Sequence, residues 1–151
     1  DFRQATEELE KRLNELQSDR PVVAADPAAT LSPPEKLRTD TRAAAKAAAA
    51  GIGPAYVGVW VGQASDCAKV DQDPLEMVAV ITPTTVRRYE SVCNMTETPL
   101  TNGSATVDAQ CVAEGDVETR TLTFTLPSPD RLTLSGAEGP GTDLVRCHLP
   151  G

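Results

Sequence analysis

The sequence contains few of the residues that nucleic-acid sites and membrane spans require. Fourteen lysines and arginines face 22 aspartates and glutamates, which gives a net charge of −8 and a pI near 4.6. The basic residues form no cluster, and this argues against nucleic acid as a partner because phosphate contacts need clustered Lys and Arg. The sequence also lacks the run of about 18 apolar residues that a transmembrane helix needs.

Histidine and aromatic residues are scarce as well. The single histidine, His148, lies near the C-terminal end, and only 3% of the 151 residues are aromatic. With one histidine in that position, a Ser-His-Asp or Cys-His arrangement is not expected, and paired cysteines would not be nucleophiles. The densest acidic segment, from Asp71 to Glu76, lacks the glycine and the length of an EF-hand loop and is typical of an ordinary surface loop. We therefore expect no catalytic residue, no cofactor and no metal site.

Charge and cysteine divide the chain near residue 54. Residues 1–54 contain eight basic and nine acidic side chains, whereas residues 55–151 contain six basic and thirteen acidic ones. All four cysteines and four of the five aromatic residues fall in the second part. We therefore expect residues 55–151 to form the folded domain, preceded by a helix over 1–20 and by a linker with an Ala-rich helix over 21–54.

The four cysteines predict two disulfides. Cys93 and Cys111 lie at nearly equal distances from Asn102-Gly103, a hairpin-turn signal that would bring them opposite each other on neighbouring strands. Cys67 and Cys147 would then form a second, long bridge. A zinc site is the alternative, but the sequence has no Cys-x-x-Cys pair. Disulfides indicate an oxidising compartment, either a periplasm or the extracellular space.

Residues 2–19 have the pattern of an amphipathic helix. Its large apolar side chains recur at heptad spacing and form one seam: Phe2, Leu9, Leu13 and Leu16. Because so short a helix gains most of its stability from packing, we interpret the seam as a partner-binding surface, with a protein or a larger membrane-associated complex as the partner. The alternative is a helix that packs on its own domain. We expect any export signal or membrane anchor to lie upstream of Asp1.

The next segment predicts a linker and a second helix. Residues 20–32 have no periodicity and indicate an extended linker. The helix is expected to begin with Ser32 as N-cap, Pro33 at its first position and Glu35 completing a capping box, and to end at Gly51. Because its faces carry mostly alanine, we interpret this helix as a spacer. The alternative is close contact between its alanine face and another helix.

From residue 55 the pattern changes to the alternation typical of β-strands. Val57, Val59 and Val61 are expected on one strand face and Trp60 on the other. Further β-rich runs follow, separated by short turns: residues 75–82, 84–94, 104–113, 117–126, 130–135 and 142–147. About seven or eight short strands with short connections predict a small antiparallel up-and-down β-barrel, with a compact sandwich as the alternative.

The first and last of these strands carry a pattern found in a known superfamily. Gly58-x-Trp60 on the first strand and Arg146 near the end of the last resemble the barrel-closing signature of lipocalins and other calycins. In that family the Trp packs across the closed end of the barrel and the Arg lies over it, so the resemblance implies a structural role for Trp60 and Arg146. Gly-x-Trp followed by Cys67 is similar to small periplasmic β-barrel inhibitors of bacterial proteases. The run from Ile81 to Cys93, with the two later cysteines, resembles small secreted proteobacterial domains of no known activity.

Together these features favour a non-enzymatic, acidic binding or accessory module of an exported protein, docked on a membrane or periplasmic assembly through its N-terminal helix. The resemblances give two alternatives, a calycin-type carrier of a small ligand and a periplasmic inhibitor of a protease or lysozyme. A barrel of this length is expected to fill its own interior, so a small-molecule ligand is not expected. The chain would be periplasmic or extracellular, and tethered to a membrane if an anchor lies upstream.

Overall fold

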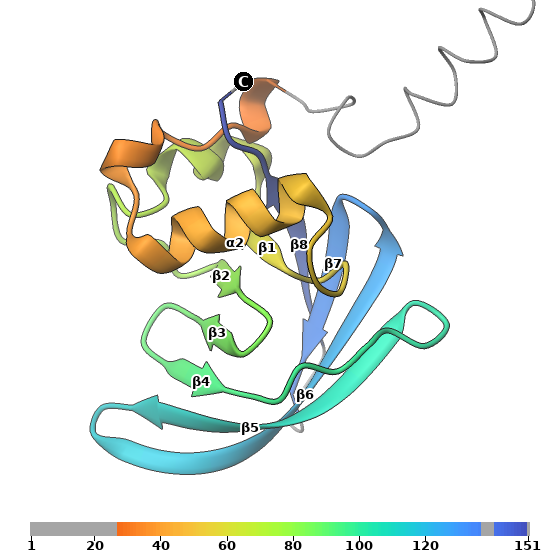
Figure 1. Cartoon of the computed structure of the whole chain (residues 1–151). Coiled ribbons are helices and arrows are strands. Elements are labelled where there is room, and N and C mark those ends of the chain that lie inside the picture. The colour runs from red at the N-terminus through yellow and green to blue at the C-terminus, as the bar shows by residue number, and fades with distance from the viewer. Residues whose placement is uncertain (1–26, 137–140, 151) are drawn as a thin grey trace, which may run out of the picture.

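The computed structural model describes residues 27–136 and 141–150 (Figure 1). Residues 1–26, 137–140 and 151 are outside this description. The predicted helix with the seam Phe2, Leu9, Leu13 and Leu16 therefore lies outside the described residues, and its docking role stays a prediction. Among the described residues, no helix is both long and apolar enough to cross a membrane.

Within the described ranges, eight antiparallel strands form a closed barrel in which each strand pairs with its neighbours in sequence and β1 pairs with β8. The strands are β1 (Gly58–Val61), β2 (Val78–Ile81), β3 (Thr85–Arg87), β4 (Val92–Asn94), β5 (Ser104–Ala113), β6 (Asp116–Ser128), β7 (Arg131–Ser135) and β8 (Thr142–Cys147). This confirms the predicted up-and-down barrel and excludes the sandwich. The expected strand over 84–94 is interrupted, because the Arg88 N–H donates to the Ser91 carbonyl at 2.8 Å and the chain turns between β3 and β4.

The interior of the barrel is filled by side chains. Trp60 on β1, Phe124 on β6 and Tyr56, just before β1, are all fully buried. The Tyr56 and Phe124 rings stack with centroids 4.5 Å apart, and Trp60 Nε1 donates a hydrogen bond to the Tyr56 carbonyl at 2.9 Å. Aliphatic side chains from other strands complete the cluster, among them Ile81, Val86, Val107, Leu132, Leu134 and Leu144. The scarce aromatic residues are thus used mainly inside the barrel.

A second apolar cluster lies outside the barrel, over β1 and β2. Besides these strands it includes residues of η1 (Pro27–Ala29), the segment around η2 (Pro34–Lys36), α2 (Thr39–Ala50) and η3 (Ala64–Lys69), and Cys147 of β8. Ala44 and Ala45 of α2 are buried together with Val59 and Val80 of the strands. The interpretation of this helix as a spacer is therefore wrong. Alanine lets the helix approach the sheet closely, so that it covers valines that would otherwise face water.

The described end of the predicted linker is also held against the barrel. The Leu31 N–H donates to the His148 carbonyl at 2.8 Å, and the Leu31 side chain is buried. Ser32 is not an N-cap, contrary to prediction. Its hydroxyl donates instead to the Ala68 carbonyl in η3 at 3.0 Å. Residues 29–32 thus belong to the packed structure.

The second helix begins later than predicted and ends where predicted. Pro33 is extended, because Pro34 disfavours the helical conformation in the residue before it, and a short 3-10 turn begins at Pro34. Leu37 is then extended and buried, and α2 begins only at Thr39. Its end at Gly51 is confirmed, with the glycine in the left-handed conformation at φ 69°.

Both faces of β1 are buried. Trp60 belongs to the interior cluster, whereas Val59 and Val61 belong to the outer cluster under α2. Val57 was expected on the same face as these valines but lies in the interior cluster. The alternation starts only with β1 itself, at Gly58, whose φ of 153° changes the direction of the chain after Val57.

Both predicted disulfides are confirmed. Cys93 and Cys111 lie directly opposite each other on β4 and β5. Cys67 in η3 bonds to Cys147 at the end of β8. The turn at Asn102-Gly103 also forms, with positive φ at both residues, 54° and 77°. Two disulfides favour folding in an oxidising compartment.

Candidate functional site

Arg146 ties together separate segments of the chain at one end of the barrel. Its guanidinium carbon lies 4.2 Å from the centroid of the Trp60 ring, in a cation–π contact. The same guanidinium donates to the carbonyl oxygens of Ala55 at 2.6 Å, Val57 at 2.8 Å and Pro129 at 3.0 Å. These bonds link residues 55–57, just before β1, to the turn between β6 and β7. Arg146 and Trp60 are thus in direct contact at this end of the barrel.

Gly58 provides the space for this guanidinium. A Cβ atom at position 58 would lie only 2.5 Å from Arg146 Nη1, and the φ of 153° is one that side chains rarely allow. The glycine of the Gly-x-Trp pattern therefore has a steric role. It lets the arginine reach the backbone in front of β1.

Asp130 and His148 lie beside the same guanidinium. Asp130 Oδ1 is 3.8 Å from Arg146 Nε and 3.5 Å from His148 Nε2. Burial lowers the pKa of His148; Asp130 opposes this shift and Arg146 adds to it. Burial also lowers the pKa of Arg146, against the attraction of Asp130. His148 is therefore mainly neutral at neutral pH. We assign a structural role to Asp130, Arg146 and His148, which connect the chain segments at this end of the barrel.

A groove of about 1010 Å³ lies at this end of the barrel. Its walls are the C-terminal half of α2, residues 51–55, the β6–β7 turn at 127–129 and residues 146–149, and it reaches Val57, Leu100 and Leu126 of the interior cluster or packed against it. Alanine, glycine, proline and leucine dominate the lining, and Ile52 is 61% exposed there. Such a surface offers apolar contact area with few polar groups, which suits an apolar segment of another protein.

A second hollow, of about 520 Å³, lies between the segment after η3 and the β3–β4 turn. Arg87 in its lining is neutralised, since it donates to Asp40 at 2.6 Å, to the Thr41 hydroxyl at 2.7 Å and to Asp71 at 3.1 Å. Burial acts to raise the pKa of Asp40, but the hydrogen bond and charge of Arg87 outweigh it, and the net shift is downward. Arg87 thus ties α2 to the sheet.

The acidic segment of the sequence is partly explained by this ion pair. The Asp71 side chain is only 3% exposed and faces Arg87, so it does not belong to an open acidic loop. In the part of the chain that the structure describes, no three His, Cys, Asp or Glu side chains are arranged to hold a metal ion.

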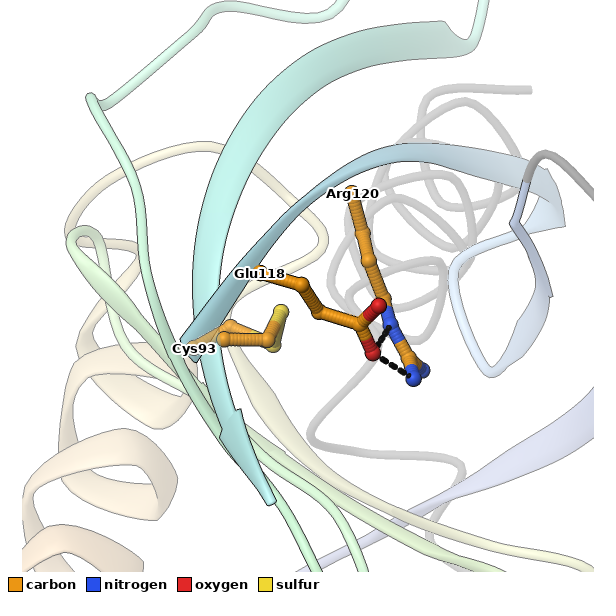
Figure 2. The surroundings of a disulfide bond; sticks show 4 residues. Cys93, Glu118 and Arg120 are labelled. Carbon is orange, nitrogen blue, oxygen red and sulfur yellow. Dashed lines mark hydrogen bonds and ion pairs between the residues drawn. A yellow bond between two sulfur atoms is a disulfide. The ribbon is translucent and has the colours of Figure 1, made fainter. Parts of the chain in front are cut away.

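Glu118 and Arg120 lie on β6 beside the Cys93–Cys111 disulfide (Figure 2). Arg120 Nε donates to Glu118 Oε1 at 2.9 Å, and the two side chains are 51% and 52% exposed. Glu118 is paired with Cys111 in the β5–β6 register, so its side chain lies on the same face as the disulfide. The sequence alone does not predict this pair, because nothing in it shows that β6 extends beyond the barrel core at Glu118 and Arg120.

The comparisons with known proteins add no counterpart to these observations. No family model matches the chain, and no match is found among curated proteins or among solved structures. Its function is therefore inferred from its own residues.

Proposed function

We propose that the chain is a non-enzymatic binding or accessory module of an exported protein and that it binds a protein partner on the outside of its barrel. The proposal rests on the packing of the barrel interior and on the apolar groove described above. Side chains such as Trp60 and Phe124 pack in the interior, while the groove at the Arg146 end of the barrel is lined mostly by small apolar residues. A filled interior argues against carriage of a small ligand, and an open apolar groove favours contact with a protein.

The N-terminal helix would provide a second contact with the same partner. Its seam (Phe2, Leu9, Leu13 and Leu16) is apolar, and Thr30, which follows it in sequence, lines the groove. We place the partner in a membrane-associated or periplasmic assembly, because the two disulfides favour an oxidising compartment.

Two other functions are distinguished by what they would require. A calycin-type carrier would need space inside the barrel, where this chain has packed side chains. An inhibitor of a protease or lysozyme would be one special case of a protein-binding module, with an enzyme as its partner. The identity of the bound protein therefore separates the inhibitor from the accessory subunit.

Co-purification from extracts and membranes of the native source tests the proposal. Leu9→Asp/Leu13→Asp and Ile52→Asp should each reduce recovery of the same protein by about tenfold or more, because each places a charge in an apolar contact. Met77→Asp is the matched control, since Met77 is 45% exposed and does not line the groove. If all variants recover that protein equally and remain folded by near-UV circular dichroism, neither surface binds it.

A further inference from the structure

The first half of β6 has one unpaired edge. β5 pairs with β6 from the turn onward, but β7 pairs with β6 only from Thr123 to Ser128. Within residues 27–136 and 141–150, no strand pairs with the other edge of Asp116–Leu122. In Figure 1 this part of β6 is the outer strand of the long curved hairpin. Its backbone therefore offers donors and acceptors to a further strand.

The turn between β5 and β6 determines which residues of β6 direct their backbone N–H and C=O groups toward the unpaired edge. Glu114 and Gly115 have φ of 51° and 85°, as a two-residue type I′ turn requires, so Ala113 and Asp116 form the first hydrogen-bonded pair. In an antiparallel ladder such pairs recur at every second residue, so the even-numbered residues of β6 bond to β5. The Leu126 N–H, which donates to the Gly103 carbonyl at 2.9 Å, follows the same rule. The outward-directed backbone groups therefore belong to Val117, Thr119 and Thr121.

We propose that this edge binds a second copy of the chain, with the two β6 strands antiparallel around a two-fold axis at Thr119. In this register Thr119 lies opposite its own copy, and Val117 lies opposite the second copy's Thr121. All outward-directed backbone groups then face one another and form about six hydrogen bonds between the chains. Val117 is 66% exposed in the single chain, so the pairing would also bring this apolar side chain against the second copy.

Charge selects this register over its neighbours. With the axis at Thr119, Glu118 lies opposite the second copy's Arg120 and Arg120 opposite the second copy's Glu118, on the face that carries the disulfide. Moving the axis by one residue would place Glu118 opposite Glu118 or Arg120 opposite Arg120, which repulsion disfavours. Each chain already holds the two side chains together at 2.9 Å, so pairing would join two ion pairs into one network. Of these three registers, only the one centred on Thr119 pairs opposite charges.

Sedimentation velocity of the full chain over a concentration series tests this proposal without any other protein. The wild type should show a monomer–dimer equilibrium. Glu118→Arg and Arg120→Glu should each raise the dissociation constant by about tenfold or more, because each variant brings two like-charged pairs together across the axis. An equimolar mixture of the two variants should form a heterodimer, since every cross-strand pair then joins opposite charges. The double variant Glu118→Arg/Arg120→Glu should dimerise like the wild type.

A backbone variant separates the strand edge from its charges. In the single chain the Thr119 N–H faces the free edge, where proline is tolerated, so Thr119→Pro should stay folded by near-UV circular dichroism and lose the dimer. Leu9→Asp/Leu13→Asp, which changes the N-terminal seam, should keep it. A wild type that is monomeric at every concentration, or a dimer that survives the charge variants and is lost only with the seam, would overturn the proposal. Neither result depends on the proposed protein partner.

Discussion

At the scale of single residues, Gly58 provides the space that Arg146 needs at its end of the barrel. A Cβ there would stand 2.5 Å from Arg146 Nη1, so a larger residue must displace the guanidinium. Displacement would remove its hydrogen bonds to Ala55 and Val57 and its contact with Trp60. A buried charge without hydrogen-bond partners is costly, so a single methyl group should disturb the whole end.

Gly58→Ala should lower the free energy of unfolding by about 2–4 kcal/mol, through backbone strain and lost hydrogen bonds of Arg146. Urea denaturation measures this change. Gly136→Ala is the control, because a Cβ at Gly136 would meet no atom of the described residues within 4 Å. Equal stabilities of the two variants would show that the space at Gly58 is not needed.

His148 gives the domain a predictable response to pH. Burial holds its pKa below the usual value, with Asp130 opposing and Arg146 reinforcing the shift. The unfolded chain regains a pKa of about 6.5, so the unfolded state binds more protons between the two values. The free energy of unfolding should therefore have its full value above about pH 6.5. It should decrease as the pH falls toward the pKa of His148 in the folded state.

Urea denaturation between about pH 7.5 and 5, the range over which a histidine titrates, measures this response. His148→Gln should remove the decrease in that range, because His148 is the only histidine of the chain. The interaction of Asp40 with Arg87, which lowers the pKa of Asp40, is lost only in stronger acid and should be common to both proteins. Identical pH profiles for wild type and variant would contradict the assignment.

At the scale of elements, the two disulfides close loops of very different length. Cys67–Cys147 spans 80 residues and links η3 to the end of β8, which is also paired with β1. Cys93–Cys111 spans 18 residues and lies within the β4–β5 pair. In the chain-entropy model the long bridge stabilises the fold by about 4.5 kcal/mol and the short one by about 3 kcal/mol.

Removal of the long bridge should therefore be the more damaging change. Cys67→Ala/Cys147→Ala should reduce the free energy of unfolding by about 1 kcal/mol more than Cys93→Ala/Cys111→Ala does. Urea denaturation of both variants under oxidising conditions gives the comparison. The opposite order would mean that strain or residual structure in the unfolded chain outweighs loop length.

The elements differ in how far the sequence could predict them. Strand alternation and turn residues are local signals, so the barrel and both disulfides could be predicted. The helix start could not, because Pro33-Pro34 and the burial of Leu37 override the local capping pattern at Ser32. An alanine face carries no sign of its own burial, so only the docked structure shows that Ala44 covers β1.

At the scale of the whole molecule, the barrel has two surfaces to which we assign the binding of other chains. The apolar groove forms from segments far apart in sequence, such as Ile52, Pro127 and Leu149, and no local pattern predicts their proximity. Among the described residues, the first half of β6 has a free edge because β7 pairs with only the second half of that strand. Both surfaces depend on tertiary structure, and for this reason sequence analysis placed partner binding in the N-terminal helix alone.

Native mass spectrometry of the full chain isolated from its native source tests the central claim most directly, namely that the chain binds a protein outside its barrel. We expect a complex with another protein that Ile52→Asp loses and Met77→Asp retains, and a released chain without an added small-molecule mass. A chain that carries a small molecule and no protein would contradict it.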